Sequence, residues 1–417
     1  MEATEEIPHM VHPEKKPRFD GEAPRQAPAV AKVLDDDNLL IEIIVRVGFP
    51  TTLVHAALVC KRWLAHASDT KFLSRFRKLH PPRLLGYYIT EGAVLLAKRF
   101  APRFVPMLPQ PPELATVIRR AESYNFDGHG GLRIMDSRSG SIFIRRYGEI
   151  ELTDVVHHPL CPQRSMDIVP PLPSVQDHRF QKYGAILSKG EGSDLSYLYV
   201  LGESTGETGK SMTHVYVLQD GAWHMHTSAT CLHSLHFGPK ALLVGNNIYV
   251  PTGSGYHIAV LNLAASSFST IQLPPGVKYH YFRGMLSRAD DASSVYFIHV
   301  EEFQLRLWLL KGDNWLLVDT ICLHEMLAIL RMSEHMIEDE DIAKVQITQV
   351  GDNGQFVFLQ VNRYILYLDI KCRTLCKVYE NIGNDPYCGL IHPFMMIWPP
   401  TFPARKDDPA RKLLAGQ

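Results

Sequence analysis

The chain has 417 residues, which is enough for a small module plus one large domain, or for two to three domains of average size. Its 43 basic and 44 acidic side chains give a formal net charge of -1, so the basic excess that nucleic-acid phosphates require is missing. The acidic start Met-Glu-Ala-Thr-Glu-Glu does not fit a secretory signal, and no apolar run approaches the roughly 20 residues that span a bilayer. We therefore expect neither nucleic-acid binding nor membrane insertion.

The two ends of the chain carry few large apolar residues. Residues 1–32 are rich in Pro, Glu, Lys and Ala, and residues 404–417 have a similar character. Such segments cannot bury enough surface to offset the entropy of the chain. We predict a disordered N-terminal tail over 1–32 and a flexible C-terminal tail over 404–417.

Residues 33–80 show the spacing of short helices. Asp35–Asp37 can cap a helix N-terminus and place negative charge there. Apolar residues then recur on one helical face: Leu39, Leu40, Ile43, Ile44 and Val47. Gly48 is a candidate C-terminal cap, and Pro50 prevents the helix from continuing.

Three further helices are predicted before residue 81. The first runs through Leu53–Val59 and can be capped by Thr51 or Thr52, and the second covers about residues 61–66. The third follows a cap at Asp69 or Thr70 and ends at Pro81-Pro82. The sequence therefore predicts a small helical domain over 33–80.

From residue 84 to residue 403 the pattern changes to short alternating runs that Gly, Asp, Asn and Ser separate. Two of these runs flank Asp136–Gly140, which is a hairpin signal. The predicted strands are Leu132–Met135, Ser141–Ile144, Leu195–Leu201, Thr213–Leu218, Ala241–Val244, Asn247–Val250, His257–Leu263, Ser294–Val300, Leu305–Lys311, Gln355–Val361 and Ile365–Ile370. One segment, Leu323–Met336, has instead the pattern of an amphipathic helix.

A weak internal repeat underlies these strands. An apolar strand, a polar turn and an aromatic-led strand follow one another in Val215–Trp223, Ile258–Phe268 and Leu307–Trp315, and a fourth copy, Leu366–Val378, has Cys376 near the aromatic position. The copies recur at roughly 45 to 60 residues, as the blades of a β-propeller do. We predict a β-propeller-like domain of about five to seven blades over 84–403, with a pair of stacked β-sandwiches as the alternative.

One segment imitates a phosphate-binding loop. It is Gly202–Ser211, but its spacing puts Ser204 where the first glycine of that motif belongs. The residues that follow, Thr213–Leu218, have the pattern of a strand and not of a helix, whose N-terminal N–H groups would hold phosphate. We interpret the segment as a polar hairpin loop.

The histidines and cysteines do not form a metal-ligand pattern. His157-His158, His224-x-His226 and His233-x-x-His236 have no cysteine or carboxylate at ligand spacing, and Cys372-x-x-x-Cys376 has no second pair. No Gly-x-Ser-x-Gly motif occurs. We therefore predict no catalytic residue, no metal site and no cofactor, and not an enzyme.

The seven cysteines are scattered, and no Asn-x-Ser/Thr acceptor occurs. Both facts suit a reducing compartment. We expect the protein in the cytoplasm, the nucleus or both.

Three segments stand in a fixed order within residues 33–80. They are Leu39-Leu-x-x-Ile-Ile44, Leu58-Val-Cys-Lys-x-Trp63 and Asp69-x-x-Phe-Leu73. In that order and spacing they resemble the F-box, a short helical module by which a substrate receptor docks onto a ubiquitin ligase. The chain looks especially like F-box proteins of grasses, including Leu84–Tyr88 and Arg103–Pro106. Its later strands are similar to the plant F-box-associated β-propeller-like domain.

The resemblance implies the substrate-recognition subunit of an SKP-adaptor/cullin/F-box ubiquitin ligase. Its partners would be an SKP-type adaptor, through it a cullin–RING ligase, and an unknown protein substrate. The residues that the resemblance assigns to the adaptor-binding F-box are Leu34, Leu39, Leu40, Ile43, Ile44, Pro50, Leu58, Val59, Cys60 and Trp63. Loops of the β domain would bind the substrate, and the candidates are Gly202–Ser211, Thr252–Tyr256 and Asp290–Ser293.

One departure from the family concerns Asp35, where F-box sequences usually have the proline that preorganises the first helical turn. We expect aspartate to substitute by capping, so that docking survives. Two alternative functions remain open. The chain is then either an interaction protein whose degenerate F-box has lost its ligase, or a sugar-binding or enzymatic propeller with an incidental helical head.

Overall fold

The structure is a computed structural model, and it describes most of residues 33–402. The described residues are 33–90, 102–126, 131–148, 152–161, 163–164, 166–171, 181–190, 195–204, 211–233, 235, 241–289, 294–330, 345–381, 389–398, 400 and 402, with the backbone alone at 181–183 and 204. The predicted tails, 1–32 and 404–417, lie outside these residues. The chain divides into two compact units, residues 1–80 with 402–417 and residues 81–401, which we describe separately.

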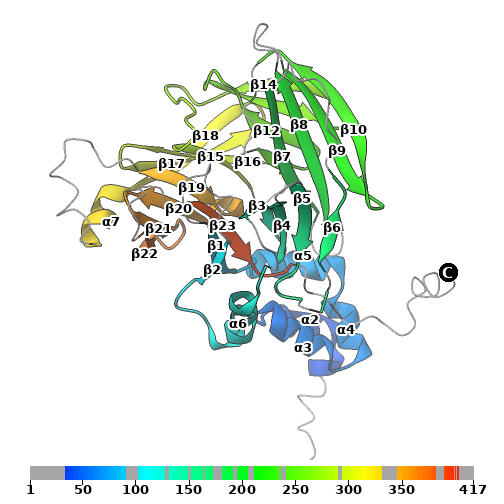
Figure 1. The fold of residues 1–417 in the computed structure, drawn as a ribbon. Coiled ribbons are helices and arrows are strands. Elements are labelled where there is room, and N and C mark those ends of the chain that lie inside the picture. The colour runs from blue at the N-terminus through cyan, green and yellow to red at the C-terminus, as the bar shows by residue number, and fades with distance from the viewer. Residues whose placement is uncertain are drawn as a thin grey trace, which may run out of the picture. The chain divides into compact units, whose positions relative to one another are not determined.

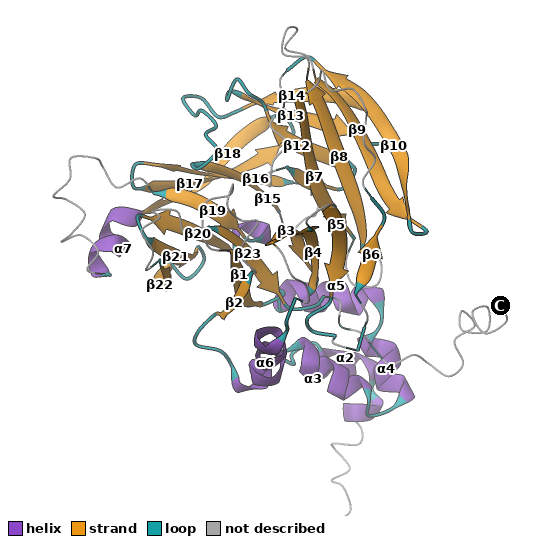
Figure 2. Ribbon diagram, viewed as in Figure 1, coloured by secondary structure: helices purple, strands orange, loops and turns teal. Residues whose placement is uncertain are grey.

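The described part of the first unit has four helices, α2 to α5, in the order that the sequence predicts (Figures 1 and 2). They are α2 (Asp37–Ile44), α3 (Pro50–Ala57), α4 (Lys61–Ala67) and α5 (Thr70–Leu79). Each helix contributes buried apolar side chains, and these are Leu40, Ile44, Leu53, Ala57, Ala67, Phe72 and Phe76.

The ends of these helices differ in part from the prediction. Asp69 caps α5 as expected, because its carboxylate accepts hydrogen bonds from the backbone N–H groups of Lys71 and Phe72. The predicted threonine cap of α3 is wrong: Pro50 is the first helical residue, where its fixed φ angle preorganises the turn. Helix α2 ends at Val45 rather than at Gly48.

The second unit is a β-propeller with six blades, all of them antiparallel sheets (Figures 1 and 2). Blade 1 contains β3 (Gly131–Arg138), β4 (Ser141–Tyr147), β5 (Leu152–His157) and β6 (Asp167–Val169); blade 2 contains β7 (Gln181–Lys189), β8 (Ser196–Ser204), β9 (Ser211–Gln219) and β10 (Ala222–Cys231); blade 3 contains β11 (Leu242–Val244), β12 (Asn247–Pro251), β13 (His257–Asn262) and β14 (Ser267–Gln272). Blade 4 contains β15 (Gly284–Arg288), β16 (Val295–Glu301), β17 (Gln304–Lys311) and β18 (Asn314–Cys322); blade 5 contains β19 (Gln346–Val350), β20 (Phe356–Val361), β21 (Tyr364–Asp369) and β22 (Thr374–Glu380); blade 6 contains β23 (Leu390–Met395), β1 (Leu84–Thr90) and β2 (Arg103–Pro106).

Blade 6 closes the ring by joining the two ends of the domain. Strand β1 pairs with β2 on one side and with β23, about 300 residues later, on the other. The first strands β3, β7, β11, β15, β19 and β23 contact one another in turn and complete the circle. The two-sandwich alternative is therefore wrong.

Apolar clusters fill the space between neighbouring blades at five of the six junctions. Phe143 and Val156 of blade 1 pack with Ile186 and Tyr197 of blade 2. Similar clusters join blades 2 and 3, 3 and 4, 4 and 5, and 5 and 6. The ring thus buries faces that a lone sheet would expose.

The repeat found in the sequence corresponds to the third strand, turn and fourth strand of blades 2 to 5. In blades 2 and 4 the second residue of the fourth strand is a tryptophan whose indole N–H donates to a carbonyl of the preceding blade. Trp223 donates to the Pro170 carbonyl at 3.0 Å, and Trp315 donates to the Gln272 carbonyl at 2.9 Å. In blade 5 the matching position holds buried Leu375, and Cys376 beside it is exposed. Cys376 is thus next to the aromatic position but not in it, and in a strand the neighbouring residue points to the opposite face.

Helices outside the blades were only partly predicted. Helix α7 (Leu323–Ile329) covers the start of the predicted Leu323–Met336 segment, and residues 331–336 lie outside the described part of the chain. Helix α6 (Ala115–Ser123), which follows the short 3-10 helix η2 (Pro112–Leu114), was missed, although buried Ile118 and Ala121 have helical spacing. A second 3-10 turn, η4 (Asp352–Gly354), precedes β20. Within the described residues no helix is long and apolar enough to cross a membrane.

Two adjacent tyrosines of blade 6 give a matched stability test. Both are buried, which raises the pKa of each phenol, but the Tyr87 hydroxyl donates to the Val378 carbonyl at 2.9 Å whereas the Tyr88 hydroxyl is buried without a partner. We expect Tyr87→Phe to lower the free energy of unfolding by about 1 kcal/mol and Tyr88→Phe to leave it unchanged or raise it by about as much. Urea unfolding of the two variants measures this, and equal losses would contradict it.

Candidate functional site: exposed apolar residues of the helical unit and one face of the propeller

The structure divides the predicted adaptor-binding residues into buried and exposed groups. Leu40 and Ile44 are 0% and 1% exposed, and Pro50 is buried as well. These three side chains are part of the interior of the helical unit, so burial separates them from the predicted residues that face solvent. Leu34 and Trp63 are half-buried.

The exposed group consists of two apolar pairs. Leu39 and Ile43, one turn apart on α2, are 46% and 44% exposed, and Leu58 and Val59 at the end of α3 are 60% and 64% exposed. Cys60 next to them is exposed as well. Exposed leucines are common on their own, but four large apolar side chains at positions that a docking motif specifies are candidates for a protein interface.

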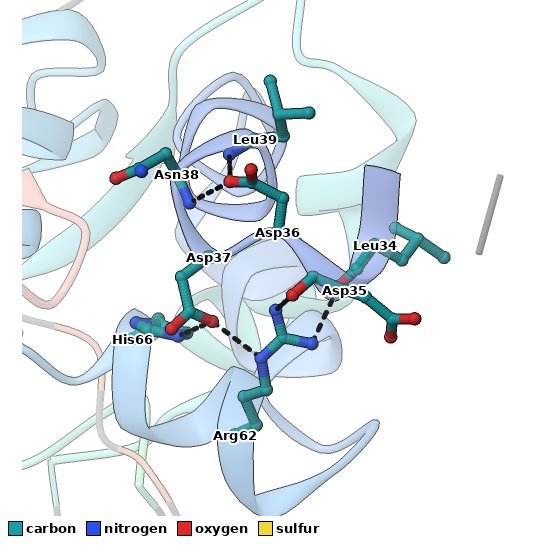
Figure 3. Close-up of polar contacts among 8 residues, drawn as sticks. All are labelled: Leu34, Asp35, Asp36, Asp37, Asn38, Leu39, Arg62 and His66. Atoms are coloured by element: carbon teal, nitrogen blue, oxygen red, sulfur yellow. Dashed lines mark hydrogen bonds and ion pairs between the residues drawn. The ribbon is translucent and has the colours of Figure 1, made fainter. Parts of the chain in front are cut away.

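Arg62 holds the start of α2 against α4 (Figure 3). Its guanidinium donates to the carbonyls of Leu34 and Asp35 at 2.8 and 2.7 Å and to the Asp37 carboxylate at 2.7 Å. His66 Nε2 lies 2.9 Å from the same carboxylate. These hydrogen bonds from Arg62 and His66 lower the pKa of Asp37. Sequence reasoning missed Arg62, which stands at the unspecified position of the Leu58–Trp63 segment.

The same region shows how the chain manages without proline at position 35. The cap of α2 is Asp36, whose carboxylate accepts from the N–H groups of Asn38 at 2.8 Å and Leu39 at 3.1 Å (Figure 3). Asp35 contributes its backbone carbonyl to Arg62, and its side chain makes no cap. The expectation that Asp35 itself would cap is therefore wrong.

This difference predicts unequal effects of two neighbouring substitutions. Asp36→Ala removes the cap and should lower the stability of the helical unit by about 1 kcal/mol. Asp35→Ala keeps the carbonyl that Arg62 uses and should change stability little. Thermal unfolding followed by circular dichroism checks this, and an equal or larger loss for Asp35→Ala would show that its side chain matters.

The propeller brings two of the three predicted substrate loops to one side. We call this side the loop face; it is where the first strand of each blade begins and the second strand ends. Thr252–Tyr256 joins β12 to β13 on it, and β8 and β9 meet there at the ends of Gly202–Ser211. The strand β9 after this segment confirms a hairpin in place of a phosphate loop, although residues 205–210 are not described.

The strand ends that flank the third predicted loop lie on the opposite side. Asp290–Ser293 lies outside the described residues, but it connects the end of β15 to the start of β16. In an antiparallel blade these strand ends, where Arg288 pairs with Val295, are at the face opposite the other two loops. In blade 1 the first and second strands are joined by the tight turn Ser139-Gly140, whose φ angles are 49° and 74°.

At the opposite side of the ring, polar groups of neighbouring first strands satisfy one another. Asp136 of β3 accepts hydrogen bonds from the backbone N–H and hydroxyl of Ser188 on β7. Arg288 of β15 donates to the Leu243 carbonyl at 2.7 Å, and Ser287 donates to the Gly351 carbonyl at 2.7 Å. These contacts join the blades in sequence.

The loop face is different, because buried polar atoms there lack partners. Among the described residues, ten buried side-chain atoms make no hydrogen bond. Nine of them lie in the half of their strand nearer the loop face, and they belong to Tyr88, Arg146, Glu203, Ser211, Thr213, His214, His257, His299 and His392; only Trp308 does not. Since buried polar groups are nearly always paired, this face is the candidate binding surface of the propeller.

The histidine and cysteine pairs singled out in the sequence have separate environments. His157 bonds the Tyr124 hydroxyl, and His158 bonds Ser141 and Asp167. Cys372 and Cys376 are exposed and unbridged. Across the described part of the chain, no three His, Cys, Asp or Glu side chains are grouped so that they could hold a metal ion.

Comparison with known proteins gives one informative match. The model of a family described as "F-box protein AT5G49610-like, beta-propeller" matches residues 133–402. No curated protein matches.

Many solved structures have a similar chain course, but at low similarity. A functionally unknown protein from Desulfotomaculum acetoxidans is 11% identical, with 74% of this chain and 89% of that chain covered and a TM-score of 0.37. The periplasmic gluconolactonase PpgL of Pseudomonas aeruginosa is 10% identical, with coverages of 72% and 84% and a TM-score of 0.38. We base no conclusion on likenesses this weak.

Proposed function

We propose that this chain, which belongs to the F-box protein AT5G49610-like, β-propeller family, is the substrate-recognition subunit of an SKP-adaptor/cullin/F-box ubiquitin ligase. In this proposal the helices of residues 33–80 are the F-box and dock on the SKP-type adaptor. The propeller binds the protein substrate. The subunit itself performs no chemistry.

The observation that carries the proposal is the exposure of Leu39, Ile43, Leu58 and Val59. In a chain whose propeller belongs to an F-box protein family, these apolar side chains occupy the F-box-like segments and face solvent. Interfaces depend on a few apolar anchors that become buried on binding. Burial of Leu40 and Ile44, and the bonds of Arg62, support a preformed docking surface.

The loop face supports the other half of the proposal. It carries the connections Thr252–Tyr256 and Gly202–Ser211 and most of the unpaired buried polar atoms. Loops on a rigid scaffold are the usual place for recognition. A substrate held there would be presented to a ubiquitin-conjugating enzyme at high effective concentration, which accelerates transfer by proximity alone.

The proposal also includes where the protein acts. Such a ligase subunit works in the cytoplasm or the nucleus, and the scattered, unbridged cysteines suit these compartments. The resemblance to F-box proteins of grasses supports a plant source.

Reconstitution with purified partners tests the proposal. The full chain is co-expressed with a plant SKP-type adaptor, captured by its own tag, and then incubated with cullin–RING ligase, ubiquitin and the activating and conjugating enzymes. We expect the adaptor to co-purify in equal amount and the cullin to join it, with ubiquitin added to captured proteins. Absence of the adaptor would refute the proposal, and adaptor without cullin would favour the interaction protein that lacks a ligase.

A further inference from the structure

Glu203 occupies an unusual position at the loop face. It is the second-last residue of β8, and the strand register places it beside the β9 residues Met212 and His214. Tyr199 and Tyr216 are direct partners further along the same two strands. Because side chains alternate along a strand, Glu203, His214, Tyr199 and Tyr216 share one face of blade 2.

The Glu203 carboxylate is buried without compensation. The residue is 7% exposed, and its Oε1 atom accepts no hydrogen bond from any residue that the structure describes. Among the described side chains, the imidazole of His214 is the group nearest to forming an ion pair with it: its Nε2 is 3.9 Å from Oε2, too far for a hydrogen bond, and its Nδ1 is also buried without a partner. Leaving a buried carboxylate unpaired is costly, so the site is built for a group that is not part of the described chain.

A second carboxylate nearby shows what a satisfied site looks like. Asp154 of blade 1 is also 7% exposed, but the Arg145 guanidinium donates to both of its oxygens at 2.8 and 2.9 Å. A cation next to Glu203 would make the same kind of charge-assisted hydrogen bond.

Two tyrosine rings lie on the same face of blade 2 as the carboxylate, because Tyr199 precedes Glu203 by four residues on β8 and pairs with Tyr216 of β9. The rings of Tyr199 and Tyr216 stack with centroids 6.1 Å apart and planes at 26°. Burial, and then the charge of Glu203, raise the pKa of Tyr216, so this ring lies within the field of the carboxylate. Aromatic faces next to a carboxylate favour a cation with an apolar stem.

We propose that Glu203, His214 and Tyr216 form a site for a basic side chain, lysine or arginine, of the protein substrate. The inference rests on the proposed function, because it names the chemistry that the substrate must present to the propeller. The cation would complete the hydrogen bonds of Glu203, while neutral and acidic side chains would leave them unmade, so the site also discriminates against the wrong peptides.

The test uses the full chain in complex with the adaptor, immobilised, and pools of short acetylated and amidated peptides. Each pool has Arg, Lys, Gln or Glu at a fixed central position and mixed residues elsewhere. Wild type should retain the Arg or Lys pool about tenfold better than the Gln and Glu pools, which is about 1.4 kcal/mol. Glu203→Gln should remove this preference, and Glu203→Asp, which keeps the charge, should retain part of it.

Two controls separate charge from folding. Asp313→Asn removes the same charge from an exposed turn at the opposite face and should keep the preference. The melting temperature of Glu203→Gln should be unchanged or higher, because the substitution removes an unpaired buried charge. The register also places Lys182 of β7 opposite Glu203, so Lys182→Met is tested too and should not alter the preference.

The inference is wrong if wild type shows no preference for basic peptides or if Glu203→Gln retains it. It is also wrong if the preference appears only in Lys182→Met, or if Glu203→Gln loses several degrees of melting temperature, since Glu203 would then serve a group of the chain itself. Adaptor capture is measured for every variant. Normal capture with no basic preference overturns this inference alone, and loss of capture by wild type overturns the proposed function.

Discussion

Leu58→Asp and Val59→Asp should each abolish adaptor capture while the helical unit stays folded. Both side chains are more than half exposed, at 60% and 64%, so a polar replacement costs the free chain little. In an interface it would bury a charge against an apolar surface, where the loss of a single anchor reaches 2 kcal/mol or more. Adaptor pull-down measures capture, and circular dichroism measures folding.

Two comparisons make this test specific. Leu79→Asp changes a side chain of similar exposure, 54%, at the end of α5, outside the predicted docking residues, and should leave capture intact. Leu40→Ala truncates a fully buried side chain, which costs roughly 2–5 kcal/mol, and should reduce capture only by unfolding the unit. If Leu79→Asp abolishes capture and Leu58→Asp does not, the docking surface lies elsewhere on the helices.

The helical unit shows what periodicity can and cannot predict. Leu39, Leu40, Ile43 and Ile44 form one apolar stripe in the sequence, and the spacing correctly predicts α2. It does not tell which edge of the stripe faces inward, because adjacent residues are only about 100° apart around a helix. The structure separates them: Leu40 and Ile44 are buried, whereas Leu39 and Ile43 are not.

Contacts between segments that are far apart in the chain cannot be predicted from the sequence pattern. The role of Arg62 depends on two backbone carbonyls nearly 30 residues earlier, and carbonyls carry no residue-specific signal. Ring closure is a similar case. Alternation identifies single strands such as β12 and β20, but the pairing of β1 with β23 joins the two ends of the domain, and no local pattern encodes it.

The sequence pattern could not identify the candidate binding residues of the propeller, for a related reason. Glu203 and His214 were part of an apparent phosphate loop and of the strand after it, and nothing in their spacing marks them as buried. Their interest arises from the absence of partners, which only the packed structure reveals. What the sequence did provide was the correct strand pattern after the loop, which excludes a helix N-terminus there.

The second large effect is expected in the propeller, where substitution of two buried aspartates of blade 1 should change stability by very different amounts. Asp154→Asn leaves Arg145 without the carboxylate that raises its pKa and fixes its position. Removing one partner of a buried ion pair costs roughly 3–5 kcal/mol. The Arg145 side chain is 20% exposed, so we expect a loss of about 3 kcal/mol, at the lower end of that range. Chemical denaturation at neutral pH measures it.

Asp136→Asn should cost far less, because among the described residues no cationic side chain makes a hydrogen bond or ion pair with Asp136, and the charge of Arg138 acts on it without such a contact. Its carboxylate is held by the neutral groups of Ser137 and Ser188, and burial raises its pKa. A raised pKa means that folding favours the protonated form, so wild type loses stability as the pH rises from the ordinary value of 3.8 through the folded-state pKa. The asparagine variant has no such loss, and its stability relative to wild type should therefore increase over that range. If Asp136→Asn lost as much as Asp154→Asn at neutral pH, the hydrogen bonds between β3 and β7, rather than the buried charge, would dominate at this joint between blades.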